Sequence, residues 1–185
     1  FGTSRLTCGG RYFLGFKVGQ IVYGTTAEQE AAFNAKIVEI INANGWAALS
    51  GYDQVKAVYD WVCANVAYDH EHFDACDSFS HLDDLTVPLQ ESYLPHTAYN
   101  GLFAGKCVCS GYAQLLYAFY NRLGVDCRII SGSAGGGPHA WNIVCLDGLY
   151  YFVDATWDAE LAQSGQEYAY FLRSEANMTD HFSDS

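Results

Sequence analysis

Three side chains in the second half of the chain have the types and order that catalysis by a thiol requires. Cys109 stands where a helical pattern begins, His139 opens an apolar segment, and Asp154 ends the next one. A cysteine nucleophile needs an imidazole to move its proton and a third group to hold that imidazole in the right tautomer. A helix start also offers backbone N–H groups that stabilise a thiolate and can bind an oxyanion. The three residues therefore predict acyl transfer through a thioester.

The segment 109–123 predicts the helix that would carry the thiol. Ala113, Leu116 and Leu123 recur on one face, and Gly124 stands where a helix commonly ends. This pattern places the Cys109 sulfur at the N-terminal end of a helix whose apolar face is buried.

Two amphipathic helices are predicted upstream. Residues 27–43 follow a capping-box sequence around Thr26, and their pattern stops near Gly45. Residues 52–68 keep apolar side chains three and four positions apart, with Asp53 in the first turn, where a negative charge is favourable. These helices are expected to cover the core.

A predicted β-hairpin decides what His139 can touch. Apolar strands are expected at 125–131, 139–146 and 149–154. Asp147-Gly148 is a strong signal for a two-residue turn between the last two strands. The glycine-rich segment 133–137 is expected to be a flexible loop that leads to His139.

The turn fixes which residues of the hairpin are neighbours. Positions 146 and 149 face each other, so opposite positions sum to 146 + 149 = 295, and Asp154 is diagonal to His139. Diagonal neighbours lie about 7–8 Å apart, a span that two side chains can bridge. Asp158 occupies the other diagonal but lies beyond the apolar strand. The register therefore favours Asp154 over Asp158 as the residue that orients His139.

Three segments resemble the cysteine, histidine and aspartate motifs of the bacterial transglutaminase-like superfamily: GKCVCSGYAQLLYAFYNRLGVDCRIISG (105–132), HAWNIV (139–144) and YYFVDATWD (150–158). The stretches 58–69 and 168–182 also resemble such proteins. Matched residue by residue, the resemblance assigns the nucleophile to Cys109, the base to His139 and the orienting carboxylate to Asp154. It implies an α+β fold with a papain-like, transglutaminase-like core, in which the nucleophile helix packs against an antiparallel sheet.

Cys107 departs from the family pattern, because relatives usually carry a small or apolar residue two places before the nucleophile. Three roles are open for it: a structural disulfide partner, a redox guard of Cys109, or a buried small residue. The chain has seven cysteines, so at least one lacks an intramolecular partner, and their spacing selects no pairing. So many cysteines favour a secreted protein, extracellular or at the cell surface.

The composition excludes several classes of partner. Nine Lys and Arg stand against 21 Asp and Glu, a formal charge of −12, which argues against binding to nucleic acids and anionic lipid surfaces. Half of the residues are hydrophobic and 16% are aromatic, enough for one core, so a single domain over 1–185 is expected. The apolar runs are too short for membrane insertion.

The remaining regions carry weaker signals. Residues 1–24 predict short strands or an N-terminal arm, and residues 69–96 predict a long acidic surface loop. No metal or other cofactor is expected, because the histidines show no ligand-like spacing to the cysteines. Four aromatic residues are expected in the core or as cleft walls: Trp141, Trp157, Tyr112 and Tyr150. His181, which matches a tail position of the relatives, is expected to be structural.

The sequence thus predicts a cysteine-dependent acyl-transfer enzyme acting on peptide or glutamine-type amide bonds of a protein or peptide substrate. Hydrolysis by a peptidase or amidase is favoured over cross-linking, because the glycine segment is expected to be open and transamidation requires exclusion of water. The alternatives are a transglutaminase with an amine acceptor, and a non-catalytic extracellular binding or adhesion module that keeps the fold. A polar residue in 52–68 or just before Cys109 is expected to complete the oxyanion site.

Overall fold

The computed structural model describes residues 25–72 and 93–184. The predicted arm 1–24 and residues 73–92, most of the predicted acidic loop, lie outside the described residues. None of the described helices has the length and apolar composition needed to cross a membrane.

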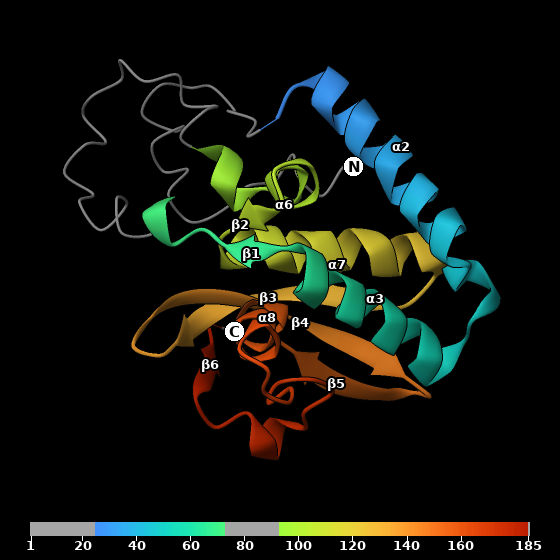
Figure 1. Ribbon diagram of the computed structural model, residues 1–185. Coiled ribbons are helices and arrows are strands. Elements are labelled where there is room, and N and C mark those ends of the chain that lie inside the picture. Colours follow the sequence, from blue (N-terminus) through green and yellow to red (C-terminus); the bar gives the residue numbers. More distant parts are fainter. Residues whose placement is uncertain (1–24, 73–92, 185) are drawn as a thin grey trace.

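A four-stranded antiparallel sheet and a central helix form the framework (Figure 1). The strand order is β5-β4-β3-β6, with bounds Leu149–Val153, Gly137–Leu146, Cys127–Ala134 and His181–Ser183. Helix α7 packs on β3 and β4, and helices α2, α3 and α6 pack on α7. The mixed helix and antiparallel sheet architecture confirms the predicted α+β class.

Helix α7 spans Cys109–Leu123, the bounds that the sequence predicted, and ends at Gly124 in the left-handed conformation. It is buried on several sides, because the sheet covers one face and helices α3 and α6 cover others. Asn142 of β4 ties α7 to the sheet by donating to the carbonyl of Ala113 at 3.0 Å. The start of α7 is therefore held in a fixed position relative to β4.

The covering helices agree with the sequence except at one end. Helix α2 spans Ala27–Asn44 and begins with the predicted capping box, in which the side chains of Thr26 and Gln29 bond to each other's backbone N–H. Helix α3 spans Gly51–Asn65, so the prediction that it continues to residue 68 is wrong. The chain leaves the helix to form strand β1, Ala67–Tyr68.

The sequence signals missed several short elements before α7. The 3₁₀ helix η5 spans Leu94–His96, within the predicted acidic loop, and α6 follows as Ala98–Phe103. Strand β2, Lys106–Cys107, pairs with β1 in parallel. This pair places Tyr68 beside Cys107, two residues before the helix start.

The predicted hairpin is confirmed. Leu146 pairs with Leu149 and Asn142 with Val153, so opposite positions sum to 295 as expected. Asp147 and Gly148 both have positive φ, as a two-residue turn of the primed type requires. Strand β5 ends at Val153, and Asp154 begins helix α8, Ala155–Gln163, which the strand pattern did not predict.

The segment 133–137 is a tight turn, and the prediction of a flexible loop there is wrong. Ala134 pairs with Gly137, which leaves Gly135 and Gly136 as a second two-residue turn with positive φ at both positions. Glycine adopts this backbone without strain, so strands β3 and β4 continue to the turn. Gly135 also packs near the Trp157 ring, because a Cβ at this position would lie 3.4 Å from Cζ2 of the indole.

Candidate active site

Cys109 is the first residue of α7 and is a half-buried free thiol. The residue before it, Val108, caps the helix without a side-chain hydrogen bond. The N–H groups of the first turn are therefore not taken by a capping side chain, as a site for a thiolate or an oxyanion requires.

His139 and Asp154 meet as the hairpin register predicts. The His139 Nε2 atom lies 2.7 Å from Asp154 Oδ2, and their side chains are 7% and 0% exposed. The other carboxylate oxygen, Oδ1, accepts a hydrogen bond from the backbone N–H of Thr156 at 2.9 Å. One carboxylate thus caps helix α8 and orients the imidazole.

The pKa of His139 depends on both the Asp154 carboxylate and the Cys109 sulfur. Burial alone would lower the pKa of His139, but hydrogen bonds to Asp154 and Cys109, with their negative charges, raise it to about 10. Because Nε2 faces Asp154, the Nδ1 atom is the one left for the Cys109 sulfur. The His139 ring thus lies between the Asp154 carboxylate and the Cys109 sulfur.

Asp154 itself is held in the ionised form. Burial would raise its pKa, but hydrogen bonds from His139 and His181 and the charges of these rings outweigh burial and lower it. A buried carboxylate requires such partners, since an unpaired charge away from water is costly.

The rival carboxylate, Asp158, serves another purpose. It accepts the Tyr59 hydroxyl at 2.7 Å and the backbone N–H groups of Ala169 and Tyr170 at 2.7 and 2.9 Å. Asp158 therefore fastens the segment after α8 to α3, and burial raises its pKa despite these bonds.

His181 joins the site although the sequence predicted only a structural role for it. Its Nε2 atom lies 3.0 Å from Asp154 Oδ2, the same oxygen that binds His139. The only signal for this contact was the resemblance of the segment 168–182 to the family tail, which says nothing of what the ring touches.

Cys107 is a fully buried free thiol, and burial holds its pKa well above the usual range. It packs against Gly111, where a Cβ would come within 2.7 Å of the sulfur. Of the three open roles, the structure supports the buried small residue and shows no disulfide for this thiol. The other described cysteines, Cys63, Cys109, Cys127 and Cys145, are also free thiols, so none of them supports the expectation that disulfides point to secretion.

Aromatic rings surround the catalytic candidates. Trp141 and Trp157 stack against His139 with centroid distances of 5.9 and 5.2 Å. Tyr112 is buried and donates its hydroxyl to the Val66 carbonyl at 2.6 Å. Tyr150 is 57% exposed, so the prediction that it lines the core or the cleft is wrong.

Tyr68 lies within the range 52–68, where an oxyanion donor was expected. Burial raises its pKa above the ordinary tyrosine value, and the negative charge of Cys109 raises it further. The Tyr68 hydroxyl therefore stays protonated at neutral pH and is able to donate a hydrogen bond.

One group among the described residues has the atoms to hold a metal ion. The ligand atoms of His139, Asp154 and His181 lie within 4.8 Å of one another. In the structure, however, both histidine Nε2 atoms are already hydrogen-bonded to the carboxylate. An ion would have to displace those protons, so the arrangement fits a hydrogen-bond network better than a metal centre.

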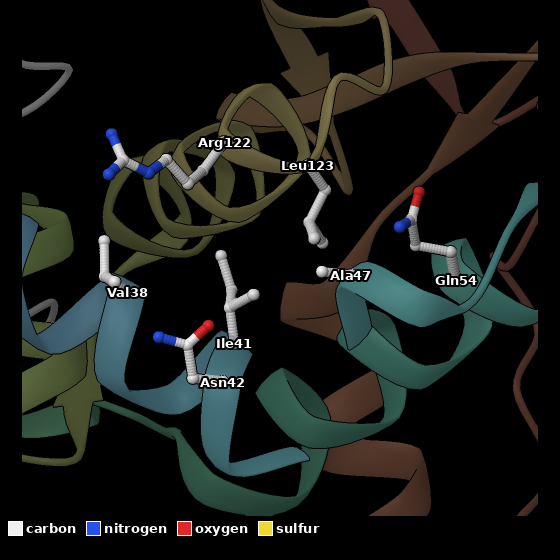
Figure 2. Close-up of a pocket in the computed structure, with 7 residues that line it drawn as sticks. All are labelled: Val38, Ile41, Asn42, Ala47, Gln54, Arg122 and Leu123. Carbon is white, nitrogen blue, oxygen red and sulfur yellow. The ribbon is translucent and has the colours of Figure 1, made fainter. Parts of the chain in front are cut away.

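A cavity of about 320 Å³ lies away from these residues (Figure 2). Its lining comes from α2, η3 (Trp46–Ala48), α3 and the C-terminal end of α7: Val38, Ile41, Asn42, Ala47, Gln54, Arg122 and Leu123. Arg122 follows Cys109 by 13 residues along α7, or about 20 Å at the rise of a helix. The cavity is therefore not the reaction site.

A thiol at the start of a buried helix, a histidine on an adjacent antiparallel hairpin and a carboxylate directly after that hairpin define a papain-like α+β fold. The family model of the transglutaminase-like superfamily matches residues 42–155, more than half of the chain. The chain therefore belongs to the transglutaminase-like superfamily.

Two curated proteins are similar to most of this chain. Kyphoscoliosis peptidase of Mus musculus is 28% identical over 146 residues, covering 72% of this chain and 20% of that protein. The Homo sapiens protein of the same name is 27% identical over 141 residues, covering 70% and 19%. The chain thus spans about a fifth of the length of these relatives.

A solved structure shares the fold. A crystal structure of a TGase superimposes with a TM-score of 0.58 and 23% identity, covering 80% of this chain and 37% of that one.

Proposed function

We propose that the protein is a cysteine-dependent enzyme that cleaves amide bonds of a peptide or protein through a thioester on Cys109. The observation that carries this proposal is the hydrogen bond between His139 and Asp154, made while the same imidazole interacts with the Cys109 sulfur. A free Cys109 also favours catalysis over a non-catalytic adhesion module.

The reaction begins with attack of the Cys109 thiolate on the amide carbonyl carbon. The developing oxyanion is bound by N–H groups at the start of α7 and by the Tyr68 hydroxyl. The His139 imidazolium then gives its Nδ1 proton to the leaving amine, and a thioester remains. Asp154 keeps the ring oriented through Nε2 during this transfer.

A second nucleophile resolves the thioester. In hydrolysis, neutral His139 takes a proton from water, the hydroxide oxygen bonds to the acyl carbon, and the acid leaves as the thiolate and imidazolium are restored. The relatives named as peptidases favour water as the acceptor. The glycine segment no longer supports hydrolysis, because Gly135 and Gly136 form an ordered turn instead of an open loop.

The first experiment measures whether the thiol is activated. Cys109 is expected to be alkylated by iodoacetamide near neutral pH ahead of the other cysteines, as read by mass spectrometry of its peptide. His139→Ala is expected to abolish this preference. Equal, slow alkylation of all thiols in the unmodified protein would refute the catalytic proposal.

The second experiment identifies the acceptor. The protein is incubated with a peptide library in ¹⁸O-labelled water, with and without a primary amine, and Cys109→Ser serves as the control. Hydrolysis predicts ¹⁸O in newly formed carboxylates. Amine incorporation into glutamine side chains without ¹⁸O would instead support the transglutaminase alternative.

A further inference from the structure

His181 is a buried ring placed between two carboxylates. Its Nε2 atom lies 3.0 Å from Asp154 Oδ2, and its Nδ1 atom lies 2.8 Å from Asp180 Oδ1. Carboxylate oxygens only accept hydrogen bonds, so each ring nitrogen must carry a hydrogen to make both contacts. The two contacts together are those that an imidazolium makes with two carboxylates.

The surroundings of His181 leave these carboxylates as its charge partners. The side chain is 1% exposed, and the rings of Trp141, Trp157 and Tyr170 have centroids 4.9, 4.6 and 5.3 Å from it. A buried charge needs partners with good geometry, because water cannot solvate it there. Asp180 is 45% exposed and connects the buried network to solvent.

A close contact between strands β6 and β3 holds the His181 ring near His139 and Asp154. Strand β6 pairs with β3, with His181 opposite Ala134 and Phe182 opposite Ser133. A Cβ at Gly132 would come within 2.0 Å of the Phe182 carbonyl oxygen. Only a glycine there lets β6 approach, so the position of His181 depends on contacts far apart in the sequence.

We propose that His181 is a positioning residue of the reaction proposed above. It holds the Asp154 carboxylate that orients His139, and its positive charge limits how strongly that carboxylate retains the His139 proton. Asp154 Oδ2 receives both imidazoles while Oδ1 receives the Thr156 N–H, so three donors fix the carboxylate. This inference rests on the proposed function, because the group it positions is the proposed base.

The charges around the ring set the direction of the expected effect. The titratable groups that face His181 are His139 from β4, Asp154 before α8, and Tyr170 and Asp180 from the segment before β6. Without the His181 charge, Asp154 has one cationic partner instead of two. Its attraction for the proton on His139 then increases, because no second cation offsets the negative charge.

Two substitutions separate the charge from the hydrogen bond. His181→Gln can place its amide nitrogen near the position of Nε2 and keep a neutral donor to Asp154. His181→Asn reaches only the position of Nδ1, so it keeps a contact to Asp180 and loses the donor. Phe182→Ala is the matched control, because Phe182 is the next residue in β6 and is exposed.

The measurement is the pH dependence of Cys109 alkylation by iodoacetamide, whose upper inflection reports loss of the His139 proton. Both variants are expected to move this inflection up by about one pH unit, whereas the control leaves it unchanged. A merely structural role would lower the melting temperature of the variants without moving the inflection. An unchanged or lowered inflection in folded His181→Gln and His181→Asn overturns the inference.

A second measurement needs no variant. Long-range ¹H–¹⁵N correlation spectra of the unmodified protein at neutral pH are expected to show both His181 ring nitrogens protonated, and a neutral ring overturns the inference. Failure of the proposed function has a different signature, since Cys109 of the unmodified protein would then show no His139-dependent reactivity.

Discussion

Replacing Asp154 with asparagine removes one charge at the centre of the site and preserves most of the local structure. Asparagine caps helices about as well as aspartate, so the bond from the Thr156 N–H and the start of α8 are expected to survive. The amide presents an NH₂ group toward the two imidazoles, which then need neutral acceptor nitrogens. His139 would turn its lone pair toward residue 154 and its remaining proton toward the sulfur.

The expected slowing of Cys109 alkylation in this variant follows from the pKa of His139. The value is about 10 in the intact site against an ordinary 6.5, a difference of 10 − 6.5 = 3.5 units, and burial alone would lower it below the ordinary value. The Asp154→Asn variant should therefore hold a neutral imidazole at pH 7. A cysteine without a cationic partner is only a few per cent ionised at that pH, so alkylation of Cys109 is expected to slow by about 30-fold.

The assay is the rate of iodoacetamide alkylation of Cys109 between pH 5 and 11, followed on its peptide by mass spectrometry. Asp158→Asn is the matched control, because Asp158 is also a buried carboxylate, in the first turn of α8, but bonds to Tyr59 and not to His139. The control should lose stability and keep the wild-type profile. A folded Asp154→Asn protein with the wild-type profile would refute the assignment of Asp154 as the orienting carboxylate.

Three further predictions concern stability and the second thiol. Gly132→Ala is expected to destabilise the fold by about 1–3 kcal/mol in thermal or urea unfolding, because its Cβ meets the Phe182 backbone; unchanged stability would contradict the close contact of β6. Above the ordinary thiol pKa of about 8.5, the unfolded state holds no proton on either Cys109 or His139, whereas the folded state keeps one on His139, so the melting temperature should fall as the pH rises from about 8.5 to about 10, and His139→Gln should flatten that slope. Cys107→Ala is expected to leave Cys109 alkylation within about 2-fold, since a buried, protonated thiol does not react; loss of Cys109 reactivity would revive a redox role for Cys107.

The sequence alone determined the parts of the site that local rules encode. The turn residues Asp147 and Gly148 set the hairpin register, and the register made His139 and Asp154 neighbours. The helix start at Cys109 followed from apolar periodicity and from the glycine at the other end. Such signals depend on a few neighbouring residues or on one turn, so they can be interpreted without knowing the rest of the fold.

Only the tertiary structure decided what surrounds these three residues. The second imidazole on Asp154 comes from His181, which reaches the site because β6 pairs with β3 across about fifty residues of chain, a contact that no local pattern encodes. Cys107 is buried where strand β2 pairs with β1 from a distant part of the chain. The ordered turn at Gly135 and Gly136, in contrast, is a local feature, because paired glycines favour a two-residue hairpin turn. The spacing of side chains predicts whether a segment forms a strand or a helix. Which other segment packs against that element depends on the close packing of the whole core.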